Sequence, residues 1–355
     1  MIMKYSVIVP VYNRPDEVDE LLESLCTQTL KDFEVVIIED GSTITCKDVC
    51  DKYADILDLH YYYKENSGPG QSRNYGVERA NGEYVLIVDS DAVAPAGFIQ
   101  AIDDELRRQP SDAWGGPDAA HESFSDVQKA ISYAMTSFFT TGGIRGGKKQ
   151  LDKFYPRSFN MGIRREAYLA LGGFSKTRFS KMALYGEDID FSIRIYKAGL
   201  SCRLFPDAWV WHKRRTDFRK FWRQIYNSGY ARINLWRMYP EALKLVHLLP
   251  AVFTVGTALL LLVALAGVVM AVLGFAVINE PGCNPAPIII IAGLFLSALS
   301  LSPLLLYSML IFIDSSIRNR SVYVGLLSIP ASFTQLIGYG IGFIESWWSN
   351  CLFRR

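Results

Sequence analysis

The carboxyl-terminal third of the chain contains three long stretches that carry no charged residue, namely 248–279, 281–313 and 321–344. A helix needs about 20 consecutive apolar residues to span the hydrocarbon core of a bilayer. Each stretch is long enough. The sequence therefore predicts a soluble amino-terminal part followed by two to three transmembrane helices within residues 247–355.

A basic and aromatic segment precedes the first of these stretches. Its residues include Arg214, Arg215, Arg219, Lys220, Trp222, Arg223, Tyr226, Arg232, Trp236 and Arg237. Nucleic-acid binding can produce such a composition, but the position beside a membrane span favours helices in the headgroup layer over residues 216–246. Lys and Arg concentrate on the cytoplasmic side of membrane proteins, so this segment is expected there.

The remaining loops extend this membrane topology. The loop 280–286 has no Lys or Arg and is expected to face outward, whereas Arg318 and Arg320 are expected to face inward. The third stretch ends at Trp347-Trp348, an interfacial aromatic pair. It either crosses the membrane or folds back, and the sequence leaves both possibilities open.

The amino-terminal part is expected in the cytoplasm, at the inner face of the membrane. Met1 to Lys4 is followed directly by a strand pattern, without the apolar core of a secretory signal. The six cysteines are scattered, which fits reduced thiols better than a disulfide framework. The net charge of +1 averages over both parts and says little about partners.

Strand and helix patterns alternate over the first 110 residues, which predicts a parallel sheet flanked by helices. Strands are expected at 6–12, 33–39, 60–63 and 84–88, and helices from Arg14 and at 45–53, 71–80 and 95–108. Residues 115–149 have weak periodicity and are expected to form a mobile, substrate-facing region. Further along, a helix is predicted over 187–197, and short strands over 202–205 and 208–211.

The strand pattern Tyr84 to Val88 ends in two carboxylates, at Asp89-Ser90-Asp91. In open α/β sheets the carboxyl ends of strands line the ligand-binding crevice. Two unpaired acids would repel each other and resist burial. A divalent cation that carries a diphosphate removes this conflict, because hard cations bind both kinds of oxygen. The alternative is a polar turn at the end of a strand.

Five motifs occur in a characteristic order: Val7 to Arg14, Glu39 to Ser42, Asn66 to Asn74, Asp89 to Asp91, and Gly186 to Asp190. Together they resemble the family 2 glycosyltransferases of GT-A fold, over roughly residues 5–215. The resemblance implies a Rossmann-like, mixed and mostly parallel sheet. It also implies a nucleotide-sugar-binding half at 1–110 and an acceptor and catalytic half at 111–215.

The resemblance implies roles for the residues on the donor side. Tyr12 would pack on the base, Asp40 would accept a hydrogen bond from uracil, and Arg73 would bind the diphosphate. The turn at Gly70 would present backbone amides to a phosphate. The full donor set is Pro10, Tyr12, Asn13, Arg14, Asp40, Gly70, Arg73, Asp89 and Ser90. A structural turn at 10–14 and a surface charge at Arg73 are the plain alternatives.

A divalent metal, Mg²⁺ or Mn²⁺, is implied as cofactor. Asp91 would be the direct ligand, Asp89 would reach the ribose or the metal shell, and His212 matches the position of a further ligand. A single histidine can equally be structural.

Asp188 is the candidate general base, and it begins a predicted helix beside Glu187. Adjacent carboxylates tend to raise one pKa. The alternative is that these acids stabilise the positive end of the helix. Asp190 and Arg194 are expected to form a local ion pair, while Asn160, Gly172, Gly173 and Glu187 are candidates for the acceptor side.

These observations predict an inverting, metal-dependent glycosyltransferase that moves one sugar from a nucleotide sugar, UDP-linked, to a hydroxyl of a lipid-linked or glycan acceptor. Membrane lipids are expected partners and nucleic acid is not. The Gln-x-x-Arg-Trp motif of processive synthases is absent. One rival is a polyprenyl-phosphate sugar synthase. Another is a membrane transport subunit with a regulatory sugar-nucleotide domain, although uncharged spans argue against transport.

Overall fold

A computed structural model of the chain describes residues 4–119, 124–142, 154–175, 186–278 and 286–352. The chain divides into two compact units. The first comprises Met1–Phe124 and Gly146–Arg214, and the second comprises Ser125–Arg145 and Arg215–Arg355.

The first unit is built on a seven-stranded sheet with the strand order β3-β2-β1-β4-β8-β6-β9. The strands are β1 (Tyr5–Val11), β2 (Phe33–Asp40), β3 (Asp58–Lys64), β4 (Tyr84–Val88), β6 (Ala113–Gly115), β8 (Asn160–Arg164) and β9 (Cys202–Leu204). Strands β3, β2, β1 and β4 are parallel, and β8 runs antiparallel to both of its neighbours. The predicted mixed, mostly parallel sheet is confirmed.

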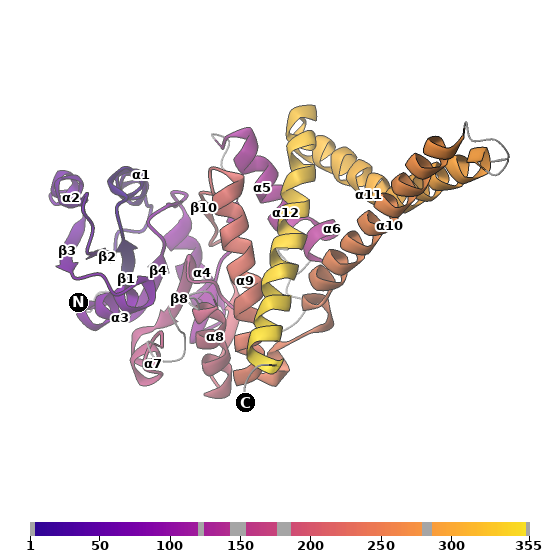
Figure 1. The fold of residues 1–355 in the computed structure, drawn as a ribbon. Helices are drawn as coiled ribbons and strands as arrows, with labels where there is room; N and C mark the ends of the chain where they lie inside the picture. The colour runs from indigo at the N-terminus through magenta and orange to yellow at the C-terminus, as the bar shows by residue number, and fades with distance from the viewer. Residues whose placement is uncertain (1–3, 120–123, 143–153, 176–185, 279–285, 353–355) are drawn as a thin grey trace. The chain divides into compact units, whose positions relative to one another are not determined.

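Helices cover both faces of this sheet (Figure 1). Successive side chains of a strand point to opposite faces, so Val7 and Val9 pack with α1 (Pro15–Cys26), α2 (Lys47–Tyr53) and α4 (Phe98–Arg108). Ile8 packs on the other face, with α3 (Pro69–Arg79), α7 (Arg165–Ala170) and α8 (Glu187–Lys197). The central strands are therefore buried on both sides, which explains their unbroken apolar sequence.

A small second sheet extends the carboxyl end of β4. It consists of β5 (Ala92–Val93), β10 (Val210–His212) and β7 (Asp118–Ala119), in the order β5-β10-β7. Strand β10 runs antiparallel to β5 with His212 opposite Ala92. This register brings His212 next to Asp91, although the two residues are far apart in the sequence.

The second unit is helical. It contains α5 (Asp126–Thr136), α6 (Phe138–Thr141), α9 (Phe218–Met238), α10 (Leu249–Val277), α11 (Ala286–Asn319) and α12 (Val322–Trp347), with the short turns η1 (Pro240–Ala242), η2 (Leu245–His247) and η3 (Trp348–Leu352). Three helices are long and apolar enough to cross a membrane, over Leu245–Ala276, Ala286–Asn319 and Val322–Asn350. They correspond to the three uncharged stretches.

The region 115–149 differs from the expectation of weak structure. Its described part contains β7, α5 and α6, and α5 begins with a capping box between Ser125 and Gln128. Helix α5 buries Ala130, Ile131 and Ala134 in a core shared with α9 and α12. These partners lie far along the chain, so the local pattern alone did not reveal the helix. The outward loop predicted at 280–286 falls mostly outside the described residues.

Candidate active site

Three metal-ligating side chains meet at the carboxyl end of β4. The ligand atoms of Asp89, Asp91 and His212 all lie within 4.8 Å of one another. His212 Nε2 is 3.1 Å from Asp91 Oδ1 and 4.0 Å from Asp89 Oδ2. The ring of Phe159 stacks on His212 at a centroid distance of 4.7 Å, which fixes the imidazole plane. The two carboxylates suit Mg²⁺ or Mn²⁺, and the imidazole adds a nitrogen donor typical of transition metals, so the three residues together fit Mn²⁺ and the two aspartates fit Mg²⁺.

The charges around Asp91 keep it ionised. Burial alone would raise the pKa of Asp91, but the attraction of His212 and Arg14 outweighs burial and holds this pKa well below its usual range. Burial alone would lower the pKa of His212, and the two aspartates outweigh it in the opposite direction. Arg14 Nη1 also contacts Asp91 Oδ2. A bound cation would replace part of this positive charge.

Arg73 lies between two carboxylates of the protein. Its Nη2 is 2.8 Å from Asp89 Oδ1 and its Nη1 is 2.7 Å from Glu187 Oε1. The side chain is only 5% exposed. This low exposure contradicts the surface-charge alternative, while the predicted role in diphosphate binding stays a prediction. The guanidinium connects the end of β4 to the start of α8.

Glu187 is the first residue of α8 and is buried. Burial, opposed by Arg73 and assisted by the charge of Asp188, raises the pKa of Glu187 to about 7. Its carboxylate packs directly against Gly70, where an added Cβ would lie 2.3 Å from Glu187 Oε2. Gly70 therefore makes room for this carboxylate.

Asp188 follows Glu187 and makes different contacts. Its Oδ2 lies 3.2 Å from Arg157 Nη1, and its Oδ1 accepts a hydrogen bond of 2.9 Å from the backbone amide of Ile189. The helix starts after Gly186, whose φ of 98° favours glycine. Asp190 is fully buried and pairs with Arg194 at 2.9 Å, which confirms the predicted local ion pair.

The strand ends of β1 and β2 form the other side of this sheet edge. Asp40 accepts hydrogen bonds of 2.9 Å from the backbone amides of Ser67 and Gly68, and it pairs with Lys64. Asn13 Oδ1 accepts hydrogen bonds from the amides of Thr43, at 2.8 Å, and Ile44.

Tyr12 behaves differently from these tethered residues, because its side chain is exposed. Its ring is free to stack on a planar ligand. Pro10 lies within β1 opposite Ile38, and Ser90 is buried.

Two acceptor-side candidates have contacts inside the protein. Asn160 Nδ2 donates to the Ala208 carbonyl at 2.9 Å. Gly173 has a φ of 60°, and an added Cβ would lie 2.3 Å from Asn74 Oδ1. Both connect neighbouring segments of the first unit.

Sequence reasoning missed Arg157 and Lys64, which contact Asp188 and Asp40. Neither residue belongs to a motif, so only the folded chain reveals their partners.

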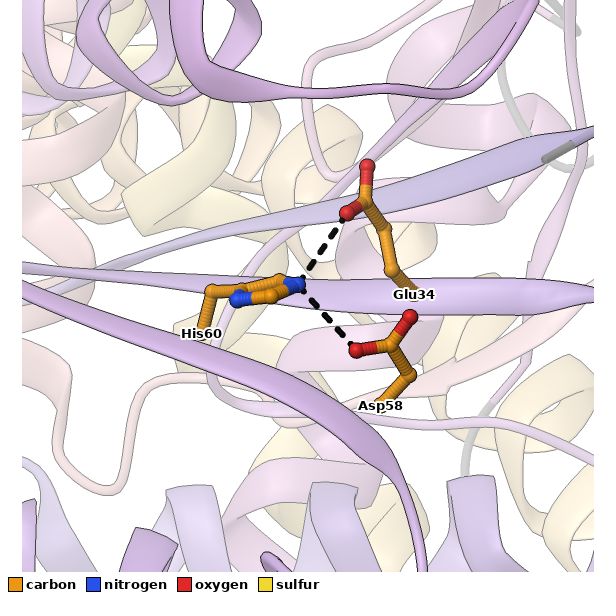
Figure 2. A group of neighbouring side chains, drawn as sticks. All are labelled: Glu34, Asp58 and His60. Carbon is orange, nitrogen blue, oxygen red and sulfur yellow. Dashed lines mark ion pairs between the residues drawn. The ribbon is translucent and has the colours of Figure 1, made fainter. Parts of the chain in front are cut away.

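A second group of two carboxylates and a histidine lies at the opposite end of the sheet. Figure 2 shows His60 between Glu34 and Asp58, with Nε2 3.3 Å from Glu34 Oε2 and 3.1 Å from Asp58 Oδ1. Glu34 is buried and also accepts hydrogen bonds from Ser6 Oγ at 2.6 Å and from the amide groups of Asn81. Its carboxylate is already satisfied by the protein, as expected of a structural group.

The first unit is similar in sequence to known proteins. Residues 6–172 match the family model "Glycosyl transferase family 2". An uncharacterized glycosyltransferase of Rickettsia felis is 31% identical over 137 residues, which cover 39% of this chain and 22% of the relative. Poly(ribitol-phosphate) beta-N-acetylglucosaminyltransferase TarS of Staphylococcus aureus is 44% identical over 93 residues, which cover 25% of this chain and 16% of the relative.

A solved structure extends the likeness to nearly the whole chain. The mannosyltransferase PcManGT of Pyrobaculum calidifontis, in complex with GDP-Man and Mn²⁺, has a TM-score of 0.54 at 16% identity and covers 98% of this chain and 88% of its own. At this identity the likeness shows the fold. The curated relatives are named as glycosyltransferases or N-acetylglucosaminyltransferases. The segments that match this chain span only 13% to 36% of the lengths of these relatives.

Proposed function

Because this chain carries a family 2 glycosyltransferase domain, we propose that it moves one sugar from a nucleotide sugar to a hydroxyl of a lipid-linked or glycan acceptor. The observation that carries the proposal is the group of Asp89, Asp91 and His212 at the carboxyl end of β4. This is the position at which open α/β sheets bind ligands. His212 and Arg14 keep Asp91 ionised there, and Arg73 pairs with Asp89.

The donor would bind through these ligands and through the adjacent strand ends. Asp91 and His212 would hold Mg²⁺ or Mn²⁺, with Asp89 beside them. When bound, the cation neutralises charge on the departing nucleoside diphosphate. Arg14 is one-third exposed beside Asp91, so its guanidinium is available to a phosphate.

The base would lie against the exposed ring of Tyr12, near Asp40. Asp40 Oδ1 accepts from the Ser67 amide and from Lys64, whereas Oδ2 accepts from the Gly68 amide and retains accepting capacity. This capacity fits an imide N–H and supports a UDP-linked donor.

Asp188 would act as the general base. Its carboxylate takes the proton of the acceptor hydroxyl as that oxygen bonds to the anomeric carbon. The bond from this carbon to the diphosphate oxygen breaks, and the diphosphate leaves with the electron pair. A single displacement inverts the configuration. Arg157 would hold the Asp188 carboxylate in place through the 3.2 Å contact.

The same contact favours a second candidate, a polyprenyl-phosphate sugar synthase. Arg157 is about one-third exposed beside Asp188, and an arginine in this position suits a phosphate acceptor. A phosphate oxygen is already ionised and needs no base.

The helical second unit supports an acceptor that is membrane-linked. Helix α9 carries exposed Arg219, Lys220 and Arg223, and the apolar helices α10 and α11 follow it. This arrangement suits the cytoplasmic face of a membrane, where anionic lipids attract basic segments. We retain residues 1–110 as the donor half and assign acceptor contacts to the later residues of the first unit.

The test is release of nucleoside diphosphate by the full chain in detergent with a lipid extract, over a panel of UDP-, GDP- and dTDP-sugars. We expect release with a UDP-sugar that requires Mg²⁺ or Mn²⁺ and increases with the extract. Metal-independent release, or no release with any donor, would contradict the proposal.

The product distinguishes the two candidates. A glycoside formed on a hydroxyl withstands mild acid, whereas a glycosyl phosphate is cleaved by it. Release of the newly added sugar by mild acid as a free monosaccharide would select the synthase, whereas its release within a larger saccharide would indicate a hydroxyl of a lipid-linked glycan.

A further inference from the structure

The third apolar helix, α12, is packed differently from the other two. Half of the residues in its most apolar window are buried, against 22% in the corresponding windows of α10 and α11. Its buried positions include Gly338, Gly340 and Gly342. A helix in lipid exposes apolar side chains, whereas α12 directs half of its residues to other parts of its own unit.

The main partner of α12 is α9, and their backbones touch. An added Cβ at Gly229 of α9 would lie 2.1 Å from the Tyr339 carbonyl oxygen, and one at Gly342 of α12 would lie 2.1 Å from the Tyr226 carbonyl oxygen. Further along, Arg237 Nη1 donates to Asn350 Oδ1 at 3.2 Å. The two helices therefore run together over most of the length of α9.

Helix α9 is unsuited to the hydrocarbon core. It exposes Arg219, Lys220 and Arg223 near its start and Arg237 near its end. These charges are spread over about 27 Å at 1.5 Å per residue, which nearly equals the thickness of the core. If both ends of α9 lay in polar layers, Arg232, five residues before Arg237, would lie about 8 Å inside the hydrocarbon core. A helix that lies along α9 shares its environment.

The contacts of α12 with the other apolar helices lead to the same conclusion. Helices α10 and α11 form an antiparallel pair, in which Gly267 meets Gly293 and Phe253 meets Tyr307. Gly325 of α12 lies against the Phe312 carbonyl at the end of α11, and Gly340 lies against the Pro250 carbonyl at the start of α10.

Both contacts are at the same end of the pair. From Gly325 to Gly340, α12 advances about 22 Å. A helix running back antiparallel to α11 would by then have reached the level of Ser297, well inside the pair. Instead, Gly340 meets the first turn of α10. Helix α12 thus lies across the base of the pair.

We propose that α12 does not cross the membrane. It lies with α9 at the bilayer surface, and the chain crosses the bilayer twice, through α10 and α11. The partner of the α9 and α12 surface is the headgroup layer of an anionic bilayer. Trp222, Trp347 and Trp348 are exposed on these two helices, and such side chains favour the interface.

The topology can be measured in sealed vesicles of both orientations. A flexible protease-cleavable tag is appended after Arg355. Glu78→Cys, on an exposed side chain of α3, marks the side of the first unit, and the native Cys283 marks the connection between α10 and α11. Labelling by a membrane-impermeant maleimide is assigned to each cysteine by peptide mass.

We expect the tag to be cut from the side on which the thiol introduced by Glu78→Cys is labelled, with Cys283 labelled from the other side. Cleavage of the tag from the Cys283 side would overturn the proposal, because α12 would then cross.

A matched pair of lysine substitutions provides a second measurement. Leu299, on α11, and Ile341, on the carboxyl-terminal half of α12, are both exposed, at 58% and 38%. We expect Leu299→Lys to reduce the amount of protein integrated in the membrane severalfold and Ile341→Lys to leave it unchanged within twofold. An equal loss in both variants would also overturn the proposal.

Discussion

Two groups, each of two carboxylates and one histidine, lie at opposite ends of one sheet. Asp89, Asp91 and His212 follow the carboxyl end of β4, whereas Glu34, Asp58 and His60 lie at the amino ends of β2 and β3. In both groups the ligand atoms lie within 4.8 Å of one another. Proximity and residue type therefore do not distinguish them.

The surroundings of the two groups do differ. Besides its contact with His60, Glu34 accepts hydrogen bonds from two neutral donors, Ser6 in β1 and Asn81 before β4. Asp91 and Asp89 are satisfied by Arg14 and Arg73, which are charged groups. A carboxylate held by neutral donors is structural and stays in place. A carboxylate balanced by a partly exposed cation such as Arg14 can exchange that partner for a metal ion.

Asp91→Ala is expected to have the largest effect. The variant loses the ligand around which the first group is organised. A metal ion stabilises the charge of such a transition state by several kcal/mol. Without it, we expect the release of nucleoside diphosphate to fall by roughly a thousandfold or more. The assay is metal-dependent release in Mn²⁺ and in EDTA. Asp58→Asn, in the second group, is the matched control and should retain activity within about twofold. Equal losses in both variants would break the contrast.

Asp188→Asn should separate binding from chemistry. The amide keeps the size of the side chain but cannot accept a proton, and general-base catalysis is typically worth about 10²–10⁴-fold. We expect transfer to fall by at least about a hundredfold, while calorimetry in the presence of metal gives an unchanged affinity for the nucleoside diphosphate. Glu78→Gln is the exposed control. Near-normal transfer by the Asp188 variant would favour the phosphate acceptor.

The sequence predicted the strand that carries the acids, the parallel sheet and the position of His212. These depend on local patterns and on the order of five motifs. It did not predict that Arg73 joins Asp89 to Glu187, because a buried ion pair across 114 positions leaves no local trace. Helix α5 was missed for a similar reason, since its apolar face packs on α9 and α12. Both the contacts of Arg73 and the formation of α5 depend on partners that are distant in the sequence.

Glu187 should make the protein less stable as the pH rises. Its folded-state pKa of about 7 lies above the ordinary value of 4.5, so the folded state holds the proton more tightly. This stabilisation is complete below about pH 4.5 and is lost as the pH rises to about 7, for a total of up to roughly 3 kcal/mol at 1.36 kcal/mol per unit. The measurement is the melting temperature in detergent from pH 5 to 8, relative to Glu187→Gln. A constant difference between the two proteins would contradict the assignment.

Glu34 should show the opposite dependence. Burial alone would raise its pKa, but hydrogen bonds from Ser6 and Asn81 outweigh burial and lower the pKa. Its contribution is therefore present at neutral pH and lost as the pH falls below its ordinary range. In Glu34→Gln an amide NH₂ replaces one carboxyl oxygen and faces the donors of Ser6 or Asn81. The lost hydrogen bond lowers the free energy of unfolding by about 1–3 kcal/mol. Thermal melting at pH 7 measures this loss, and activity per folded molecule should be retained. A large loss of specific activity would make the second group functional.

His60→Gln should have the smallest effect and is the sharpest test of the second group. The His60 side chain is 39% exposed and Asp58 is 49% exposed, so solvent screens their attraction. Exposed ion pairs contribute about 0–1 kcal/mol, and we expect a change in the free energy of unfolding within that range. Mn²⁺ or Zn²⁺ titrated into the Asp91→Ala variant, in which the second group is intact, should produce no saturable heat. A stoichiometric binding signal in that variant, abolished by adding His60→Gln, would show that the amino-terminal end of the sheet also holds a metal. Location at the carboxyl ends of the strands would then no longer distinguish a metal-binding group from a structural one.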